Sequence, residues 1–266
     1  MVRLNCLVEG QTEEQFVRLV LAPHLAAFDV VAAARAVEVS RTRPTVYRGG
    51  FRRQGAYEQV RKDLLNWMKE DAGDDARFTT MFDLYALPTD FPGQRDDLPP
   101  VQGLPRKVHR RLMGPLASAS REPVGQRDER PDCYRRVERI EAAFARHVGG
   151  RRFIPHIQLH EFEALLLVDP QQFDWYHIED ADAAGIVRLC SLVAAVSSPE
   201  LIDDGPDTTP SKRILAELPR YRKAGQGPVV AEKIGIERMR AACPHFAAWL
   251  TKLEALGSTQ EPAGSR

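Results

Sequence analysis

Short apolar runs alternate with amphipathic stretches along the first half of the chain. Residues 3–9, which end at Gly10, have the length and composition of a buried strand. Residues 33–40 and 78–87 predict further strands, and residues 56–69 carry apolar side chains at helical spacing. Strands that alternate with helices predict βαβ units. We therefore expect an α/β fold with a mostly parallel sheet flanked by helices.

One more strand is predicted at residues 153–159, and from residue 178 to residue 256 the apolar spacing is mostly helical. The organisation expected from these patterns is an α/β domain at 1–175 with a long loop and basic helical insertion at 86–150, a helical C-terminal region at 176–256 packed on it, and a disordered tail at 257–266.

The overall composition favours no class of function, but one segment of the chain has an excess of basic residues. The chain has 266 residues, of which 43% are hydrophobic and 28% are charged, and its formal net charge is zero. No overall field therefore favours nucleic acid or membrane. Residues 86–152 nevertheless hold fourteen Lys and Arg against nine Asp and Glu. This surplus indicates either a solvated helical face or a surface that meets phosphates.

The spacing of the cysteines indicates in which cellular compartment the protein works. The four of them lie far apart and form no CxxC pair, which argues against a zinc ribbon and a disulfide framework and fits a reducing cytoplasm. The first residues show no apolar signal core, and no run of about eighteen apolar residues occurs. A cytoplasmic protein without a membrane partner is expected.

Carboxylates stand near the ends of three predicted strands. Glu9 ends the first strand and Glu13 follows in the next helical turn, whereas Asp83 belongs to a later strand. Glu161 and Glu163 follow the last strand. The carboxyl ends of parallel strands share one edge, so these side chains are expected to converge. Carboxylate oxygens suit Mg²⁺ or Mn²⁺, and all five are candidate metal ligands.

The carboxylates differ in how strongly their positions favour a role in chemistry. Glu13 can serve only as a first-turn partner of the helix dipole. Asp83 stands among apolar neighbours, where a buried charge needs a partner or a cation. Glu161 and Glu163 would share a face on a strand but would diverge by about 200° on a helix.

Two histidines accompany the last strand. His160 directly precedes Glu161 but belongs to no HExxH zinc motif, and it is a candidate for substrate binding. His156 is expected to have a structural role. The chain also lacks the phosphate loop, dinucleotide fingerprint and serine elbow of ATPases, dinucleotide enzymes and serine hydrolases.

Basic residues at two places could meet phosphates. Lys212 and Arg213 open a predicted helix, where an anion-binding end and an ordinary capped surface helix are both open. Arg106, Lys107 and Arg110 belong to the basic segment after the Pro-rich loop at 87–105, which could be a substrate lid or a docking loop.

Four motifs together resemble a known family. They are "VEGQTEEQF", "FDLYALPTDFPG", "HIQLHEFEALL" and "TPSKRI". As a set they resemble a bacterial family of unassigned function with a Toprim-like domain, domain-of-unknown-function family 4276. That family is related in motif to the Toprim nucleases found beside OLD-type ATPases in phage-defence loci. In the wider Toprim group, a Glu after the first strand and an Asp-x-Asp pair after a later strand hold Mg²⁺.

The resemblance assigns roles to individual residues. Glu9 matches the Glu after the first strand, Glu13 matches an acidic residue of the nuclease branch, and Asp83 matches the first Asp of the pair. Tyr85 stands where the second Asp would be. Further ligands would have to come from other carboxylates: Glu161, Glu163 or Asp90.

The resemblance implies a Mg²⁺- or Mn²⁺-dependent nuclease that cleaves DNA or RNA in a defence system, with a separate OLD- or AAA-type ATPase as partner. Glu9 would be a metal ligand or general base, and Lys212 would stabilise charge on the phosphate. The alternatives are a non-catalytic subunit that binds nucleic acid or nucleotide on an ATPase and, less favoured, a phosphohydrolase that acts on a small nucleotide.

Overall fold

The computed structural model describes residues 1–37, 56–94, 131–176, 178–202 and 208–258. The strands are β1 (Val2–Val8), β2 (Val30–Ala36), β3 (Ala76–Asp83), β4 (Phe153–Ile154) and β5 (Ile157–Gln158). The α-helices are α1 (Gln11–Phe16), α2 (Ala22–Ala26), α3 (Ala56–Glu70), α5 (Asp132–Val148), α6 (Glu163–Leu166), α7 (Asp180–Ala194), α8 (Pro210–Glu217), α9 (Lys223–Ile234), α10 (Ile236–Ala242) and α11 (Pro244–Ser258). A π-helical turn, η1 (Val17–Leu21), joins α1 to α2, and the 3₁₀ turns are η2 (Leu84–Ala86), η3 (Pro170–Trp175) and η4 (Pro199–Leu201).

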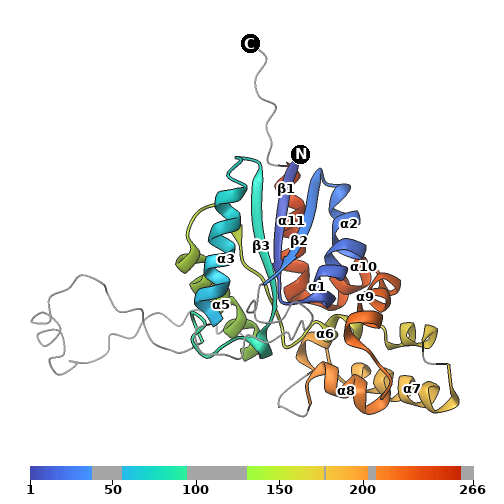
Figure 1. Ribbon diagram of the computed structural model, residues 1–266. Coiled ribbons are helices and arrows are strands. Elements are labelled where there is room, and N and C mark those ends of the chain that lie inside the picture. Colours follow the sequence, from blue (N-terminus) through green and yellow to red (C-terminus); the bar gives the residue numbers. More distant parts are fainter. Residues whose placement is uncertain (38–55, 95–130, 177, 203–207, 259–266) are drawn as a thin grey trace, which may run out of the picture.

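The sheet is parallel, as the alternation of strands and helices predicts. Its order is β2-β1-β3-β4, and β5 also pairs with β3. Every recorded pairing, from β1 with β2 to β3 with β5, is parallel. Helices α3 and α5 lie on one side of the sheet, and α1, α2, α10 and α11 lie on the other (Figure 1). The predicted α/β class with a mostly parallel sheet flanked by helices is therefore confirmed.

Both faces of β1 are buried, which explains why its sequence is almost continuously apolar. Leu4, Cys6 and Val8 belong to the core cluster that contains the helices of the α11 side. Leu7 belongs to the second cluster, with residues of α3 and α5. Burial on both faces fixes the register of β1 and thereby the position of Glu9 directly after it.

The strand expected at residues 153–159 is broken in two. Pro155 separates β4 from β5 because proline has no backbone N–H to donate to the ladder. Thr79 and Thr80 on β3 compensate, since their hydroxyls donate to the carbonyl oxygens of Ile154 and His156 at 2.6 and 2.9 Å. The break redirects the chain toward the carboxyl edge of β3.

The C-terminal helices share a core with the first strand. Phe246, Trp249 and Leu250 of α11 lie in the same buried cluster as Leu4 of β1. Trp249 also donates from its indole N–H to Thr79 Oγ1 at 2.9 Å. Helix α11 extends to Ser258, two residues into the tail expected to begin at 257. The boundary at residues 175–176 stays a prediction. Among the helices of the described residues, none has the length and apolar character needed to cross a bilayer.

Gly185 on α7 is expected to tolerate no side chain. A Cβ there would lie 2.4 Å from the carbonyl oxygen of Glu217 in α8. Gly185→Ala should therefore lower the free energy of unfolding by about 1–3 kcal/mol, although alanine is the better helix former. Urea denaturation measures the change. In the matched reversal on the same helix, Ala184→Gly at an exposed position, the cost should be only about 1 kcal/mol. A more stable Gly185→Ala protein would contradict the close approach of α7 and α8.

Candidate metal centre at the carboxyl edge of the sheet

The carboxyl ends of β1 and β3 carry the first acidic residues of the site. Glu9 follows β1 directly, and Asp83 is the last residue of β3. The two strands are parallel neighbours, with Val8 opposite Met81. Their ends therefore meet at one edge, as the sequence predicts.

Glu13 joins them from the first turn of α1. Its Oε2 accepts a hydrogen bond from the backbone N–H of Gly10 at 3.0 Å, and its side chain is buried. Gly10 stands at the N-cap position, and Thr12 lies inside the helix. The acidic group of the helix start thus faces the sheet edge and not solvent.

A sharp reversal after β5 brings the chain back over Asp83. His160 adopts a left-handed backbone conformation with φ of 60°, which is uncommon outside glycine. Its carbonyl oxygen accepts from the Tyr85 N–H at 3.1 Å. The next residue but one, Phe162, donates its N–H to Asp83 Oδ1 at 2.8 Å. Strained backbone held by such bonds is frequent at functional sites.

Lys223 is the cation of this site. It is the first residue of α9, and its Nζ lies 3.2 Å from Asp83 Oδ2 and 3.0 Å from Glu163 Oε2. Glu163 opens α6 and is fully buried, and its Oε1 accepts from the Tyr221 hydroxyl at 3.3 Å. The lysine side chain itself is 40% exposed, so it joins a buried acidic pair to the surface.

Burial dominates the electrostatics of the carboxylates. It raises the pKa of Glu9 well above its usual range, and the charges of Asp83 and Glu13 raise it further. Burial also raises the pKa of Glu13 and of Glu163 to about 7, against the opposing effect of Lys223. One ammonium group does not offset the crowding of these acids. Added positive charge would therefore be strongly favoured here.

The pKa values of Asp83 and Lys223 are both raised, but by opposite causes. Burial raises the pKa of Asp83 and the neighbouring Glu161 adds to it, although Lys223 lowers it. Burial lowers the pKa of Lys223, but the carboxylates of Asp83, Glu163 and Glu13 together raise it well above its usual value. The lysine is therefore firmly protonated, and its single ammonium group is shared between the Asp83 and Glu163 carboxylates.

Glu161 and Glu163 lie neither on a strand nor on one helix, which resolves the two options left open by the sequence. Glu161 is in the loop before α6, close enough to Asp83 and Glu163 to raise the pKa of both. Its Oε2 accepts from the backbone N–H of Ser211 at 2.9 Å. The helix end expected to bind a phosphate thus already receives a carboxylate of the protein.

Of the expected basic residues, the structure describes Lys212 and Arg213, and neither contacts a carboxylate of the site within the described residues. Lys212 is exposed on α8, and within the described residues no ion pair joins it to an acid. Arg213 donates from Nε to the Thr208 carbonyl oxygen at 3.2 Å. Arg106, Lys107 and Arg110 lie outside the described residues. Substrate-binding roles for all of these residues, and for His160, stay predictions.

Tyr85 is the position at which the resemblance to the Toprim group would place a second Asp. It lies on the 3₁₀ turn η2 with its side chain 37% exposed. Asp90, further along, is also exposed. Glu163, distant from Asp83 in sequence, is the acid that shares Lys223 with it.

The donor set of this edge fits a hard divalent cation. All the candidate ligands are carboxylates, and Glu9 Oε2 is buried without a hydrogen-bond partner among the described residues. Among the described residues, one group of three acidic or histidine side chains has ligand atoms that all lie within 4.8 Å of one another. That group is Glu141, His156 and His245, and it does not belong to this edge of the sheet. The carboxylates around Lys223 would therefore have to draw together on a bound ion.

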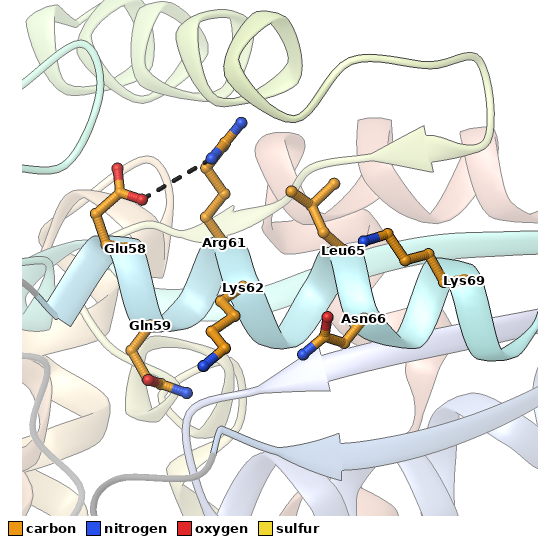
Figure 2. Close-up of a pocket in the computed structure, with 7 residues that line it drawn as sticks. All are labelled: Glu58, Gln59, Arg61, Lys62, Leu65, Asn66 and Lys69. Atoms are coloured by element: carbon orange, nitrogen blue, oxygen red, sulfur yellow. Dashed lines mark ion pairs between the residues drawn. The ribbon is translucent and has the colours of Figure 1, made fainter.

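A hollow on the outer side of α3 offers no comparable chemistry. Figure 2 shows its lining, which comes entirely from that helix: Glu58, Gln59, Arg61, Lys62, Leu65, Asn66 and Lys69. The ion pair between Arg61 and Glu58 spans 3.8 Å at the surface. No polar group from a second element converges on it within the described lining, so we assign no site there.

The comparisons with known proteins give a family. Residues 8–254 match the family model described as Domain of unknown function (DUF4276). The chain belongs to this family. The match begins at the last residue of β1, ends within α11 and includes every carboxylate described above. No curated protein and no solved structure matches the chain.

Sequence reasoning missed Lys223 in this DUF4276 chain. The segment around it, "RKAGQGPVV", holds two glycines and a proline, which disfavour a helix. Gly227 is required where α9 approaches its neighbours, since a Cβ there would lie 3.0 Å from Tyr221 Oη and 3.5 Å from Thr12 Cγ2. A lysine just before a glycine-rich apolar stretch was the available signal.

Proposed function

We propose that this protein is a Toprim-like nuclease that depends on Mg²⁺ or Mn²⁺ and hydrolyses phosphodiester bonds in DNA or RNA. One observation carries the proposal: carboxylates from β1, α1, β3 and the segment after β5 gather around a single lysine. A buried acidic cluster of this kind is costly unless it binds a cation. Such a destabilising arrangement is expected where the charges take part in catalysis.

The residues have distinct roles in this proposal. Glu9, Glu13, Asp83 and Glu163 would hold the metal, with Glu161 available through the oxygen that Ser211 does not engage. Lys223, partly exposed at the surface, would contact a non-bridging oxygen of the scissile phosphate and stabilise its developing charge. This is the role that the sequence assigned to Lys212.

The reaction is a hydrolysis. A water oxygen bonds to phosphorus, the ester P–O bond breaks, and the water proton passes to the leaving oxygen, which gives a phosphomonoester and a hydroxyl. A bound Mg²⁺ would neutralise charge on the phosphate and favour ionisation of the water. Phe162 and Gly10 hold Asp83 and Glu13 through backbone N–H groups, so the acids are oriented before substrate arrives.

The setting of the activity rests on the motif resemblance alone. We propose that the nuclease is the effector of a phage-defence system, that it acts in the cytoplasm, and that a separate OLD- or AAA-type ATPase controls it. The four cysteines are free thiols, in keeping with a reducing compartment.

Incubation with supercoiled plasmid, single-stranded DNA and tRNA tests the activity directly. Cleavage of at least one substrate is expected with Mn²⁺ or Mg²⁺ and not with EDTA. Asp83→Asn protein, prepared in parallel, should be inactive, which excludes a contaminating nuclease. Absence of cleavage together with absence of metal binding at the acidic site would contradict the proposal.

One observation favours a second function. Lys223 already neutralises part of the acidic pair, and the carboxylates are not drawn together as metal ligands. A subunit that binds nucleic acid or nucleotide on an ATPase without cleaving it would keep this arrangement. Such a protein would bind a labelled oligonucleotide equally well with EDTA and with Mn²⁺, and Asp83→Asn would not change its affinity.

A further inference from the structure

Three residues far apart in sequence meet inside the protein, away from the acidic edge. Glu141 comes from α5, His156 from the link between β4 and β5, and His245 from the first turn of α11. Glu141 Oε1 lies 3.0 Å from His245 Nε2 and 3.6 Å from His156 Nδ1. All three side chains are buried. Two imidazoles and a carboxylate thus face one small volume.

His156 is unexplained by the hydrogen bonds around it. It is fully buried, and neither ring nitrogen has a well-aligned hydrogen bond within the described residues; the buried Gln158 side chain interacts with it but also lacks a well-aligned partner there. Trp249 stacks on the ring at 4.2 Å with planes 9° apart, so the orientation of the imidazole is fixed. A buried polar group without a partner costs about 1–3 kcal/mol. The contact between Glu141 and His245 does not remove this cost, because it gives the His156 nitrogens no hydrogen bond.

The spacing of the three groups suits a metal ion. Each residue offers a ligand atom, and these atoms all lie within 4.8 Å of one another. Zinc bonds of about 2.0–2.2 Å in a tetrahedron place ligand atoms about 3.3 Å apart. Modest inward movement of His156 would reach that geometry. The Ile157 carbonyl oxygen, 3.1 Å from His245 Nε2, stands where a fourth ligand could come from.

The surroundings hold two of the groups in position. Glu141 Oε1 also accepts from the Ile157 N–H at 2.9 Å. Glu200 accepts from the backbone N–H groups of His245 and Phe246 at 3.0 and 2.9 Å, which anchors the start of α11. Outer contacts of this kind orient the ligands of metal sites.

We propose that Glu141, His156 and His245 bind a transition-metal ion, with Zn²⁺ the best match. Two imidazole nitrogens and one carboxylate form a donor set typical of zinc, whereas the acidic edge offers oxygen alone. The site is enclosed, so the ion is structural. It joins α5, the β4–β5 link and α11, and it is separate from the proposed nuclease chemistry.

Metal analysis of the full chain, without an affinity tag, tests this site. After expression with added zinc and desalting, about one zinc per chain is expected by mass spectrometry. Glu141→Gln and His156→Ala should each carry less than about one-tenth of the wild-type zinc, since a structural site left with two side-chain ligands no longer closes around the ion. His147→Ala, an exposed histidine of the same helix, and Asp83→Asn should retain it.

A second measurement covers variants that fail to fold. Wild-type protein stripped of metal with dipicolinate should melt at a lower temperature and recover on addition of Zn²⁺. With Co²⁺ it should show the visible absorption of a tetrahedral complex. Wild-type protein that carries no zinc, gives no such absorption with Co²⁺ and has the same melting temperature with and without Zn²⁺ would overturn the proposal.

Discussion

Asp83→Asn is expected to reduce Mn²⁺-dependent cleavage roughly a thousandfold, the scale on which loss of a central electrostatic group acts. The substitution keeps the Oδ1 acceptor for the Phe162 N–H, so the reversal after β5 should persist. It removes only the charge that pairs with Lys223 and would hold the metal. Initial rates of plasmid nicking at saturating Mn²⁺ measure the effect.

Glu14→Gln is the matched control for this experiment. Glu14 neighbours Glu13 in α1 but is only partly buried. Its removal should leave nicking within about twofold of wild type, because exposed charges act weakly. Equal loss in both variants would indicate a general effect of negative charge near the helix start and would count against Asp83 as a ligand.

Lys223→Met should have two opposite consequences. Without metal, Asp83 and Glu163 lose their cation, and the free energy of unfolding should fall by about 2 kcal/mol. This is less than the 3–5 kcal/mol of a fully buried pair because the lysine is partly exposed. With Mn²⁺ the ion replaces the lost charge, so the variant should gain more stability from metal than wild type does. Thermal melts with and without Mn²⁺ measure both changes.

Lys212→Met separates the two lysines. Lys212 is exposed, so its removal should leave both the melting temperature and the response to Mn²⁺ unchanged. Cleavage should be lost in Lys223→Met even at saturating Mn²⁺ and kept in Lys212→Met. The reverse outcome would return the catalytic role to Lys212, as the sequence assigned it.

The sequence predicts the convergence of the strand ends well because strand and helix patterns can be recognised within short segments of the chain. Apolar runs in alternation with helices fix parallel strands, and strand ends of one polarity must share an edge. Glu9 and Asp83 therefore meet as expected. The position of Glu163 was not decidable, since Pro155 and the left-handed His160 set the path of the chain after β3.

Contacts that depend on distant packing were not predictable. Lys223 reaches Asp83 across 140 positions of sequence, through a glycine-rich helix whose propensity is poor. Glu141, His156 and His245 have no motif spacing, and His156 alone indicated only a structural role. Tertiary packing of α11 and α5 on the sheet creates that cluster, and no pattern of short period encodes it.

The most direct test of the account is a crystal of the protein soaked in Mn²⁺, with an anomalous difference map. A peak is expected within bonding distance of the Asp83 and Glu9 carboxylates, with the Lys223 ammonium moved away from Asp83. A map without a peak at this edge, and with Lys223 still bonded to Asp83 and Glu163 at Mn²⁺ concentrations used for cleavage, would contradict it.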